Sequence, residues 1–223
     1  ILGYSFAGFI VSVMMYRKII IFVKYSFCKL YLPYILNYTF PILLFSLSIF
    51  ILTQFDKILI NKFVGKYQVG LYSLAYTISS LLQVVNMALI NAWTPNFFKS
   101  FDLKNYDKLN SDIEKIFSII LLFALLLMLF GKEVCLLVVD SRYYPALFLI
   151  PIISFGFIFY SIWDIYTRVF IYMKQTKWLT IIGVICGVIS VILNYIFMPQ
   201  YGYIVGALTF VMSVFLMSLL GYF

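Results

Sequence analysis

From Trp178 to Phe223, forty-six consecutive residues carry no charged side chain. Residues 198–202 in the middle of this run read MPQYG, and proline and glycine so close together are typical of a turn. A helix rises about 1.5 Å per residue and the hydrocarbon core of a bilayer is about 30 Å thick, so about 20 residues cross it. The run therefore predicts two membrane crossings joined by a tight turn.

The same pattern recurs along the chain, with further charge-free stretches at 1–16, 30–55, 67–98, 116–131 and 143–163. Only 11% of the residues are charged and 65% are hydrophobic, whereas soluble domains carry about 25% charged residues. Backbone polar groups in lipid must be paired internally, which leaves helices or a closed barrel. The apolar runs are continuous and lack the alternation of barrel strands. We therefore predict an all-α, polytopic transmembrane helical bundle.

Seven spans are predicted, at 1–15, 34–58, 69–93, 113–131, 145–172, 178–198 and 204–223. The first lacks an initiator methionine and the last reaches the end of the chain. We expect both end spans to be truncated and the chain to be part of a longer protein.

The connecting segments predict the orientation. Segments 16–31, 99–115 and 174–177 hold ten basic residues, whereas segments 59–68, 132–144 and 199–203 hold four. Cytoplasmic loops carry the excess of Lys and Arg, so the first set is expected in the cytoplasm. The net charge of +8 then reflects topology and contact with anionic membrane lipids, and we do not expect a nucleic-acid partner.

Two connecting segments have further character. Residues 16–31 are too charged to cross a membrane and too apolar for a free linker, which predicts an imperfect amphipathic helix on the cytoplasmic surface. Residues 99–115 mix both signs of charge and are expected to be a solvated extension. Ser111, in the pattern Ser-Asp-Ile-Glu, is a candidate N-cap for the span that follows.

The residue inventory argues against an enzyme. The chain has no histidine, so imidazole acid–base catalysis, histidine metal sites and histidine-based triads are unavailable within it. Cys28, Cys135 and Cys186 fall at three different membrane depths in the predicted topology, too far apart for a disulfide. We expect no enzymatic activity, no metal and no cofactor.

Several motifs carry a family resemblance. Residues 52–100 place Asp56 and Lys57 before a short turn ending at Gly65, then Val-Gly-Leu-Tyr at 69–72, with Pro95 closing the next span. Residues 138–155 and 173–213 continue the pattern, with a helix ending at Asn194 and Pro199 and a small-residue restart at 202–207. In order and spacing these segments resemble the polysaccharide flippases (O-antigen or capsule repeat-unit, Wzx-like) of the multidrug/oligosaccharidyl-lipid/polysaccharide superfamily.

The resemblance implies twelve or more spans in two lobes around a cavity that opens alternately to each side. Residues 1–15 would then end a span of the first lobe, residues 16–31 would link the lobes, and residues 32–223 would form the second lobe. It also implies a transporter in the bacterial cytoplasmic (inner) membrane that flips polyprenyl-diphosphate-linked oligosaccharide outward. Coupling to Na⁺ or H⁺ and a polysaccharide polymerase or ligase as pathway partner follow from the same resemblance.

Charged residues within the spans are the candidate cavity residues, since an ionisable group in lipid needs a partner or a wet cavity. Asp164 and Arg168 are four residues apart and share a helix face. They are either an internal ion pair or a pair in which Arg168 meets a substrate phosphate and Asp164 releases it or takes up a coupling cation.

Two further pairs complete the candidate set. Asp56 and Lys57 lie near the outer end of their span and point about 100° apart. They either anchor the helix or give Lys57 a role in holding an anionic headgroup. Gln83 and Asn86 share one face and are either interhelical hydrogen-bonding residues or sugar ligands.

Two other functions are open to such a chain. A cation-coupled multidrug antiporter of the same superfamily would favour acidic cavity residues, and the basic inventory here argues mildly against it. An integral-membrane polysaccharide polymerase or acyltransferase would need catalytic residues in large outer loops, whereas the outer loops here are about ten residues long.

Overall fold

The computed structural model describes residues 11–17 and 32–222. The chain divides into two compact units, Ile1–Asn37 and Tyr38–Phe223. In the first unit residues 11–17 are helical. Most of the predicted span at 1–15, and most of the predicted surface helix at 16–31, lie outside the described residues, so both stay predictions.

Helices make up the second unit, and the described residues contain no strand. Continuous apolar runs favour helices because each pairs its own backbone groups. The elements are α2 (Leu32–Phe63), α3 (Lys66–Ser79), α4 (Leu81–Asp102), α5 (Tyr106–Val138), the 3₁₀ turn η2 (Ser141–Ala146), α6 (Leu149–Tyr172), α7 (Thr176–Tyr201) and α8 (Ile204–Tyr222).

Six helical stretches within the described ranges are long and apolar enough to cross a membrane: Thr39–Phe63, Lys66–Asp102, Tyr106–Glu133, Leu149–Tyr172, Thr176–Tyr201 and Ile204–Tyr222. They correspond to the six predicted spans from 34–58 onward, which are confirmed as helices of the required length and composition. The fold is a polytopic helical bundle, and this is a multi-pass membrane protein.

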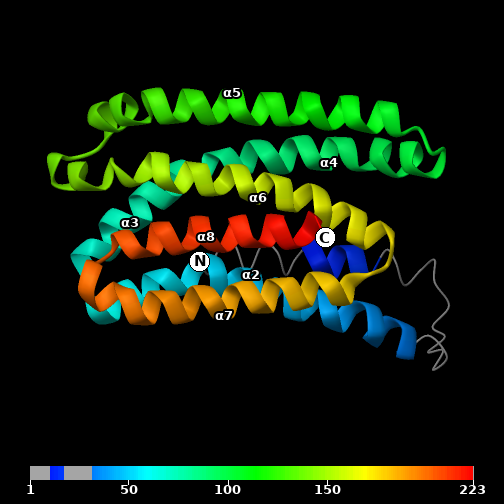
Figure 1. Ribbon diagram of the computed structural model, residues 1–223, viewed down its shortest axis with the longest axis horizontal. Coiled ribbons are helices and arrows are strands. Elements are labelled where there is room, and N and C mark those ends of the chain that lie inside the picture. The colour runs from blue at the N-terminus through cyan, green and yellow to red at the C-terminus, as the bar shows by residue number, and fades with distance from the viewer. Residues whose placement is uncertain (1–10, 18–31, 223) are drawn as a thin grey trace. The chain divides into compact units, whose positions relative to one another are not determined.

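Alternate connections lie at the same end of the bundle, as the threading predicts. In Figure 1 the α4–α5 and α6–α7 connections lie at the right, and the α2–α3, α5–α6 and α7–α8 connections lie at the left. At the first end the Tyr172 hydroxyl donates a hydrogen bond to Asp102, and the rings of Tyr172 and Phe101 are 4.6 Å apart. We call this the basic end, because segments 99–115 and 174–177, which lie at these two connections, hold Lys99, Lys104, Lys108, Lys115, Lys174 and Lys177.

Contacts at the other end, the opposite end, also join segments far apart in sequence. The Tyr67 hydroxyl donates to the Arg142 carbonyl at 2.6 Å, and the rings of Phe148 and Tyr203 are 6.3 Å apart. These contacts bring the α2–α3, α5–α6 and α7–α8 connections together.

Helix α8 packs between α6 and α7, and the two figures show it in the middle of the bundle from both sides. The α6–α8 contact is close because Gly156 has no side chain. A Cβ atom at this position would lie 2.7 Å from the ring of Phe210, which is fully buried.

Some helix ends differ from the predicted ones. Pro95 does not close its span, because α4 continues to Asp102. Phe97 and Phe101 beyond the proline pack on Tyr172 of α6, and these contacts hold the extra turns. Helix α7 likewise continues past Pro199 to Tyr201, and the chain turns at Gly202, where φ is 73°.

The basic-end connection after α4 is also shorter than predicted. Residues 103–105 alone separate α4 from α5, so most of the predicted extension at 99–115 is helical. Asn105 is the N-cap of α5, and its side chain accepts a hydrogen bond from the Lys108 N–H at 3.1 Å. Ser111 lies inside α5, so its prediction as the N-cap was wrong.

One predicted span is kinked rather than straight. Helices α3 and α4 together form the crossing Lys66–Asp102, which has a break at Ser80. Adjacent serines favour such a kink. The Ser79 hydroxyl donates to the Ile150 carbonyl of α6 at 3.1 Å, which fixes the position of the break against its neighbour.

Candidate functional site

Asp56, a predicted cavity residue, is buried where four helices meet. Its side chain on α2 is 1% exposed. One carboxylate oxygen accepts a hydrogen bond from the Tyr72 hydroxyl of α3 at 2.9 Å, and the other accepts one from the Asn194 amide of α7 at 2.7 Å. A buried carboxylate without such partners would cost several kcal/mol. These bonds therefore help to join α2, α3 and α7.

Asn194 extends this network to α8. Its side-chain oxygen accepts a hydrogen bond from the Thr209 hydroxyl at 3.0 Å, and its amide nitrogen lies 3.0 Å from the Ser190 carbonyl. We call the five residues the Asp56 cluster: Asp56, Tyr72, Ser190, Asn194 and Thr209. Each of the five is buried. The cluster holds the oxygen atoms of a carboxylate, an amide and three hydroxyls, and hard cations prefer oxygen ligands; a carboxylate can also take up a proton.

Lys57 points away from the Asp56 cluster, as the 100° separation predicts. Its ammonium lies 2.8 Å from the Gln54 side-chain oxygen and 4.7 Å from the centre of the Tyr76 ring. The side chain is half-buried. A cation over an aromatic ring is stabilised by the ring quadrupole, so Lys57 has partners of its own within the bundle.

Gln83 and Asn86 on α4 both face α6, as their spacing predicts. The Asn86 amide donates a hydrogen bond to Asp164 at 2.6 Å, and Gln83 interacts with the Tyr160 side chain. Asn86 is fully buried. The two side chains therefore make interhelical contacts, the first of the two roles considered from the sequence, and a role as sugar ligands stays a prediction.

Asp164 and Arg168 interact electrostatically, but they do not form a close ion pair. Within the described part of the chain, the charged pair closer than 4.0 Å is Asp140–Arg142, at the exposed opposite end. The carboxylate of Asp164 is turned to Asn86 instead. The Nε atom of Arg168 is buried and has no hydrogen-bond partner.

The six predicted residues thus fall into two groups rather than one. Asp56 belongs to one, and Asp164, Arg168, Gln83 and Asn86 belong to the other. Tyr76 and Tyr160 lie between them: Tyr76 interacts with Asp56 and with Tyr160, and Tyr160 interacts with Asp164. Lys57 belongs to neither group and lies beside Tyr76, between the two.

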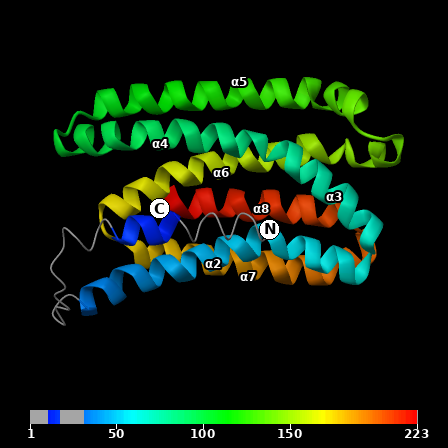
Figure 2. The same cartoon turned by 180° about the vertical axis from the view of Figure 1, so that it is seen from behind.

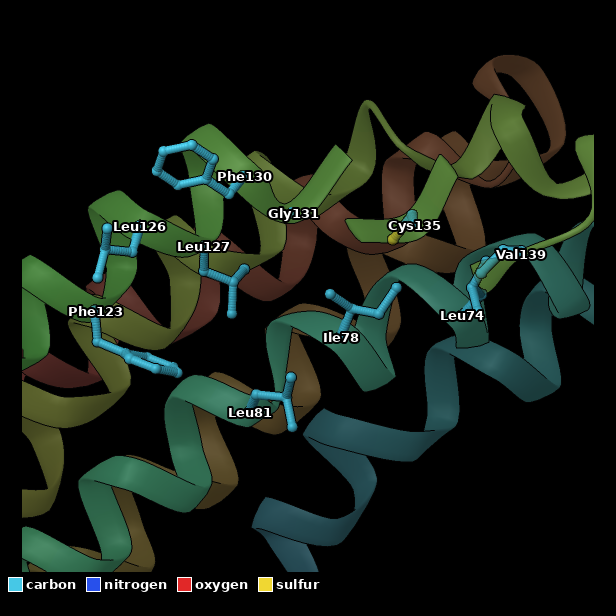
Figure 3. Close-up of a pocket in the computed structure, with 10 residues that line it drawn as sticks. All are labelled: Leu74, Ile78, Leu81, Phe123, Leu126, Leu127, Phe130, Gly131, Cys135 and Val139. Carbon is cyan, nitrogen blue, oxygen red and sulfur yellow. The ribbon is translucent and has the colours of Figure 1, made fainter. Parts of the chain in front are cut away.

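Four pockets in the bundle are lined almost entirely by apolar side chains. Figure 3 shows one of about 430 Å³ between α3, α4 and α5, where Phe123, Ile78 and Leu81 line the space. The six predicted residues line none of these four pockets. In the described ranges, no three His, Cys, Asp or Glu side chains come together as a metal site.

The sequence reasoning missed several members of the two groups. Tyr72 was recognised only as part of a motif, and Ser190 and Thr209 were not singled out. Their signal was a hydroxyl inside an otherwise apolar span, which is too common in membrane helices to select a site. Asn194 marked a helix end in the sequence pattern, but its partners are 138 and 15 residues away in sequence.

Comparison with known proteins gives one match. Residues 1–101 match the family model described as "Polysaccharide biosynthesis protein". No curated protein and no solved structure matches the chain. The match supports a membrane protein of the polysaccharide-biosynthesis type, and a helical bundle fits a transporter-type protein. The matched region includes Asp56, Lys57, Gln83 and Asn86, and it ends before Asp164 and Arg168.

Proposed function

We propose that the chain is the second lobe of a flippase that moves polyprenyl-diphosphate-linked oligosaccharide from the cytoplasmic to the outer leaflet of a bacterial cytoplasmic membrane. The observation that carries the proposal is the match of residues 1–101 to a polysaccharide-biosynthesis family in a chain with six membrane-spanning helices.

The physical need for such a protein is direct. A diphosphate and a sugar chain cannot enter hydrocarbon unaided, because the loss of water from charges and hydroxyls is prohibitive. Polar side chains inside a bundle replace that water, while the lipid tail stays in the bilayer. Lys57 and Arg168, half-buried in the bundle, are the cations that would meet the diphosphate.

Transport against a gradient needs an energy source, and a Na⁺ or H⁺ gradient acting through Asp56 or Asp164 is part of the proposal. Asp56 is the stronger carrier, since its buried carboxylate accepts hydrogen bonds from the Tyr72 hydroxyl and the Asn194 amide, and Asn194 links it in turn to the Thr209 hydroxyl. A cation bound there would bias the packing of four helices, which is how a local binding event changes a global state. A polymerase or ligase of the same pathway would receive the flipped product.

A cation-coupled multidrug antiporter is the second candidate, favoured by the buried acid Asp56 and the half-buried acid Asp164. The two functions differ in cargo. The test is complementation of a flippase-deficient strain with the complete protein and with Arg168→Ala, scoring lipid-linked oligosaccharide retained in the inner leaflet. We expect the complete protein to restore export and Arg168→Ala to reduce it.

Failure of the complete protein to restore export, combined with resistance to cationic drugs, would favour the antiporter. Unchanged export by Arg168→Ala would remove this residue from the mechanism while leaving the flippase in place.

A further inference from the structure

Three buried polar atoms on the facing sides of α4 and α6 have no hydrogen-bond partner: Asn86 Oδ1, Trp93 Nε1 and Arg168 Nε. Asn86 is 0% exposed and Trp93 is 6% exposed. Buried polar groups in proteins almost always have a hydrogen-bond partner, so an unpartnered one indicates a missing ligand, a bound water or a special role. In a membrane-spanning segment the surrounding lipid cannot supply a partner.

The three atoms belong to one stretch of the α4–α6 contact. Asn86 bonds to Asp164 across the two helices, and Arg168 lies one turn farther along α6 on the same face. Trp93 lies two turns beyond Asn86 on α4, on the same face. Its ring is 5.0 Å from that of Phe97, which in turn packs on Tyr172, one turn beyond Arg168.

We call Asn86, Trp93, Asp164 and Arg168 the α4–α6 seam. Its order, from the middle of the bundle towards the basic end, is the Asn86–Asp164 pair, then Arg168 and Trp93. Arg168 lies four residues from the end of α6, about 6 Å along the helix axis. In the predicted orientation this depth is close to the headgroups of the cytoplasmic leaflet.

The unpaired atoms define the chemistry of a ligand. Arg168 and Trp93 offer N–H donors, so the ligand must present acceptor oxygens, and a guanidinium prefers the oxygens of a phosphate. Asn86 Oδ1 is an acceptor, so the ligand must also carry a hydroxyl or N–H donor. Asp164 accepts no hydrogen bond from Arg168 Nε, and its carboxylate instead accepts one from the Asn86 amide.

We propose that the α4–α6 seam binds a phosphate ester with a neighbouring hydroxyl group, the phosphate on Arg168 and Trp93 and the hydroxyl on Asn86. The identification of this ligand with the first phosphosugar unit of the cargo rests on the proposed function. A phosphatidylglycerol headgroup also carries a phosphate beside hydroxyl groups, so this membrane lipid is the other ligand that the site could bind. In either case the seam is a loading position near the cytoplasmic leaflet.

The indole of Trp93 reports directly on this site. The complete protein, labelled with ¹⁵N-tryptophan in lipid nanodiscs, gives an Nε1–H signal for Trp93 that Trp93→Phe assigns. Three probes are titrated: a farnesyl-diphosphate-linked hexose, a short-chain phosphatidylglycerol, and a farnesyl hexoside that lacks phosphate. We expect a saturable downfield shift of the Trp93 proton with a phosphate-bearing probe and none with the phosphate-free probe.

Variants then separate the contacts. Arg168→Lys keeps the charge but loses Nε and the planar fork, and it should weaken binding about tenfold or more. Asn86→Leu should weaken the hexose-linked probe more than a farnesyl diphosphate without sugar. Lys177→Ala, which removes a cation at the basic end outside the seam, should change binding less than about twofold. Circular dichroism and gel filtration show which variants retain the fold.

The outcomes distinguish the site from the proposed function. An equal shift with the phosphate-free probe, or unaltered binding by a folded Arg168→Lys, would overturn the site. Saturation by phosphatidylglycerol alone would keep the site and assign it to a membrane lipid. An Arg168-dependent shift of the Trp93 signal in a protein that flips no oligosaccharide would support the site and refute the flippase. Flipping of oligosaccharide without any shift of the Trp93 signal would support the flippase and refute the site.

Discussion

Substitution of Asn194 by leucine tests the Asp56 cluster most sharply. Leucine has a similar size, so it removes the amide without a large cavity. Asp56 then loses one of its two hydrogen bonds, and the Thr209 hydroxyl loses its bond to Asn194 Oδ1. A hydrogen bond to a charged group contributes about 1.5–3 kcal/mol, and an interhelical bond between neutral groups in a membrane averages about 0.6 kcal/mol. The expected cost of Asn194→Leu is therefore about 2–4 kcal/mol.

The assay is reversible unfolding of the complete protein in mixed micelles of mild detergent and dodecyl sulfate, followed by circular dichroism. Asn91→Leu is the matched control, because Asn91 is an exposed amide on α4. We expect it to cost less than about 0.5 kcal/mol. In an Asp56→Asn background the charge is gone, and the cost of Asn194→Leu should fall by about 1 kcal/mol or more. Equal costs for Asn194→Leu and Asn91→Leu would refute the cluster as a structural junction.

Three further predictions concern packing, pH and topology. Gly156→Ala should destabilise the bundle by about 1–3 kcal/mol in thermal unfolding, because its Cβ would lie 2.7 Å from buried Phe210. The control is Gly70→Ala, whose Cβ would meet Tyr143 at an ordinary 3.8 Å and which should be neutral or stabilising. Equal effects of the two substitutions would contradict the argument. The Arg142 backbone N–H and guanidinium hold the pKa of the exposed Asp140 carboxyl below its usual range. The Asp140 cap on η2 is therefore fully present above the carboxyl pKa of the unfolded chain and is lost as the pH falls through the lower pKa of the folded protein. Amide hydrogen exchange at 141–146 should rise as the pH falls through this range, and the same rise in Asp140→Asn would rule out this cause. In a background without Cys28, Cys135 and Cys186, impermeant thiol reagents should reach Lys62→Cys and Lys104→Cys from opposite sides of the membrane, and labelling from one side would overturn the threading.

The spans were predictable because charge-free runs of about 20 residues have few alternatives in a chain with so little charge. The helix ends were less predictable. Pro95 and Pro199 are local signals for a stop, but aromatic packing of Phe97 and Phe101 on Tyr172 continues α4, and α7 ends only where Gly202 adopts a positive φ. Local rules give way there to contacts between distant segments.

The candidate site shows the same division. Periodicity places Gln83 and Asn86 on one face of α4, and that face does meet α6. It also places Asp164 and Arg168 on one face, yet the acid pairs with Asn86 rather than with the arginine. Which helix stands opposite a given face depends on the rotation and neighbours of each span, and one sequence carries little information on either. The junction of Asp56 with Asn194 is of this kind.

Transport itself is the most direct measurement of the central claim. The complete protein is reconstituted in vesicles that carry a fluorescent polyprenyl-diphosphate-linked oligosaccharide in the inner leaflet, and an external pyrophosphatase releases the label from molecules that reach the outer leaflet. We predict release well above that of protein-free vesicles, faster under an imposed Na⁺ or H⁺ gradient and reduced in Arg168→Ala. Release no faster than from protein-free vesicles, with or without a gradient, would contradict the flippase.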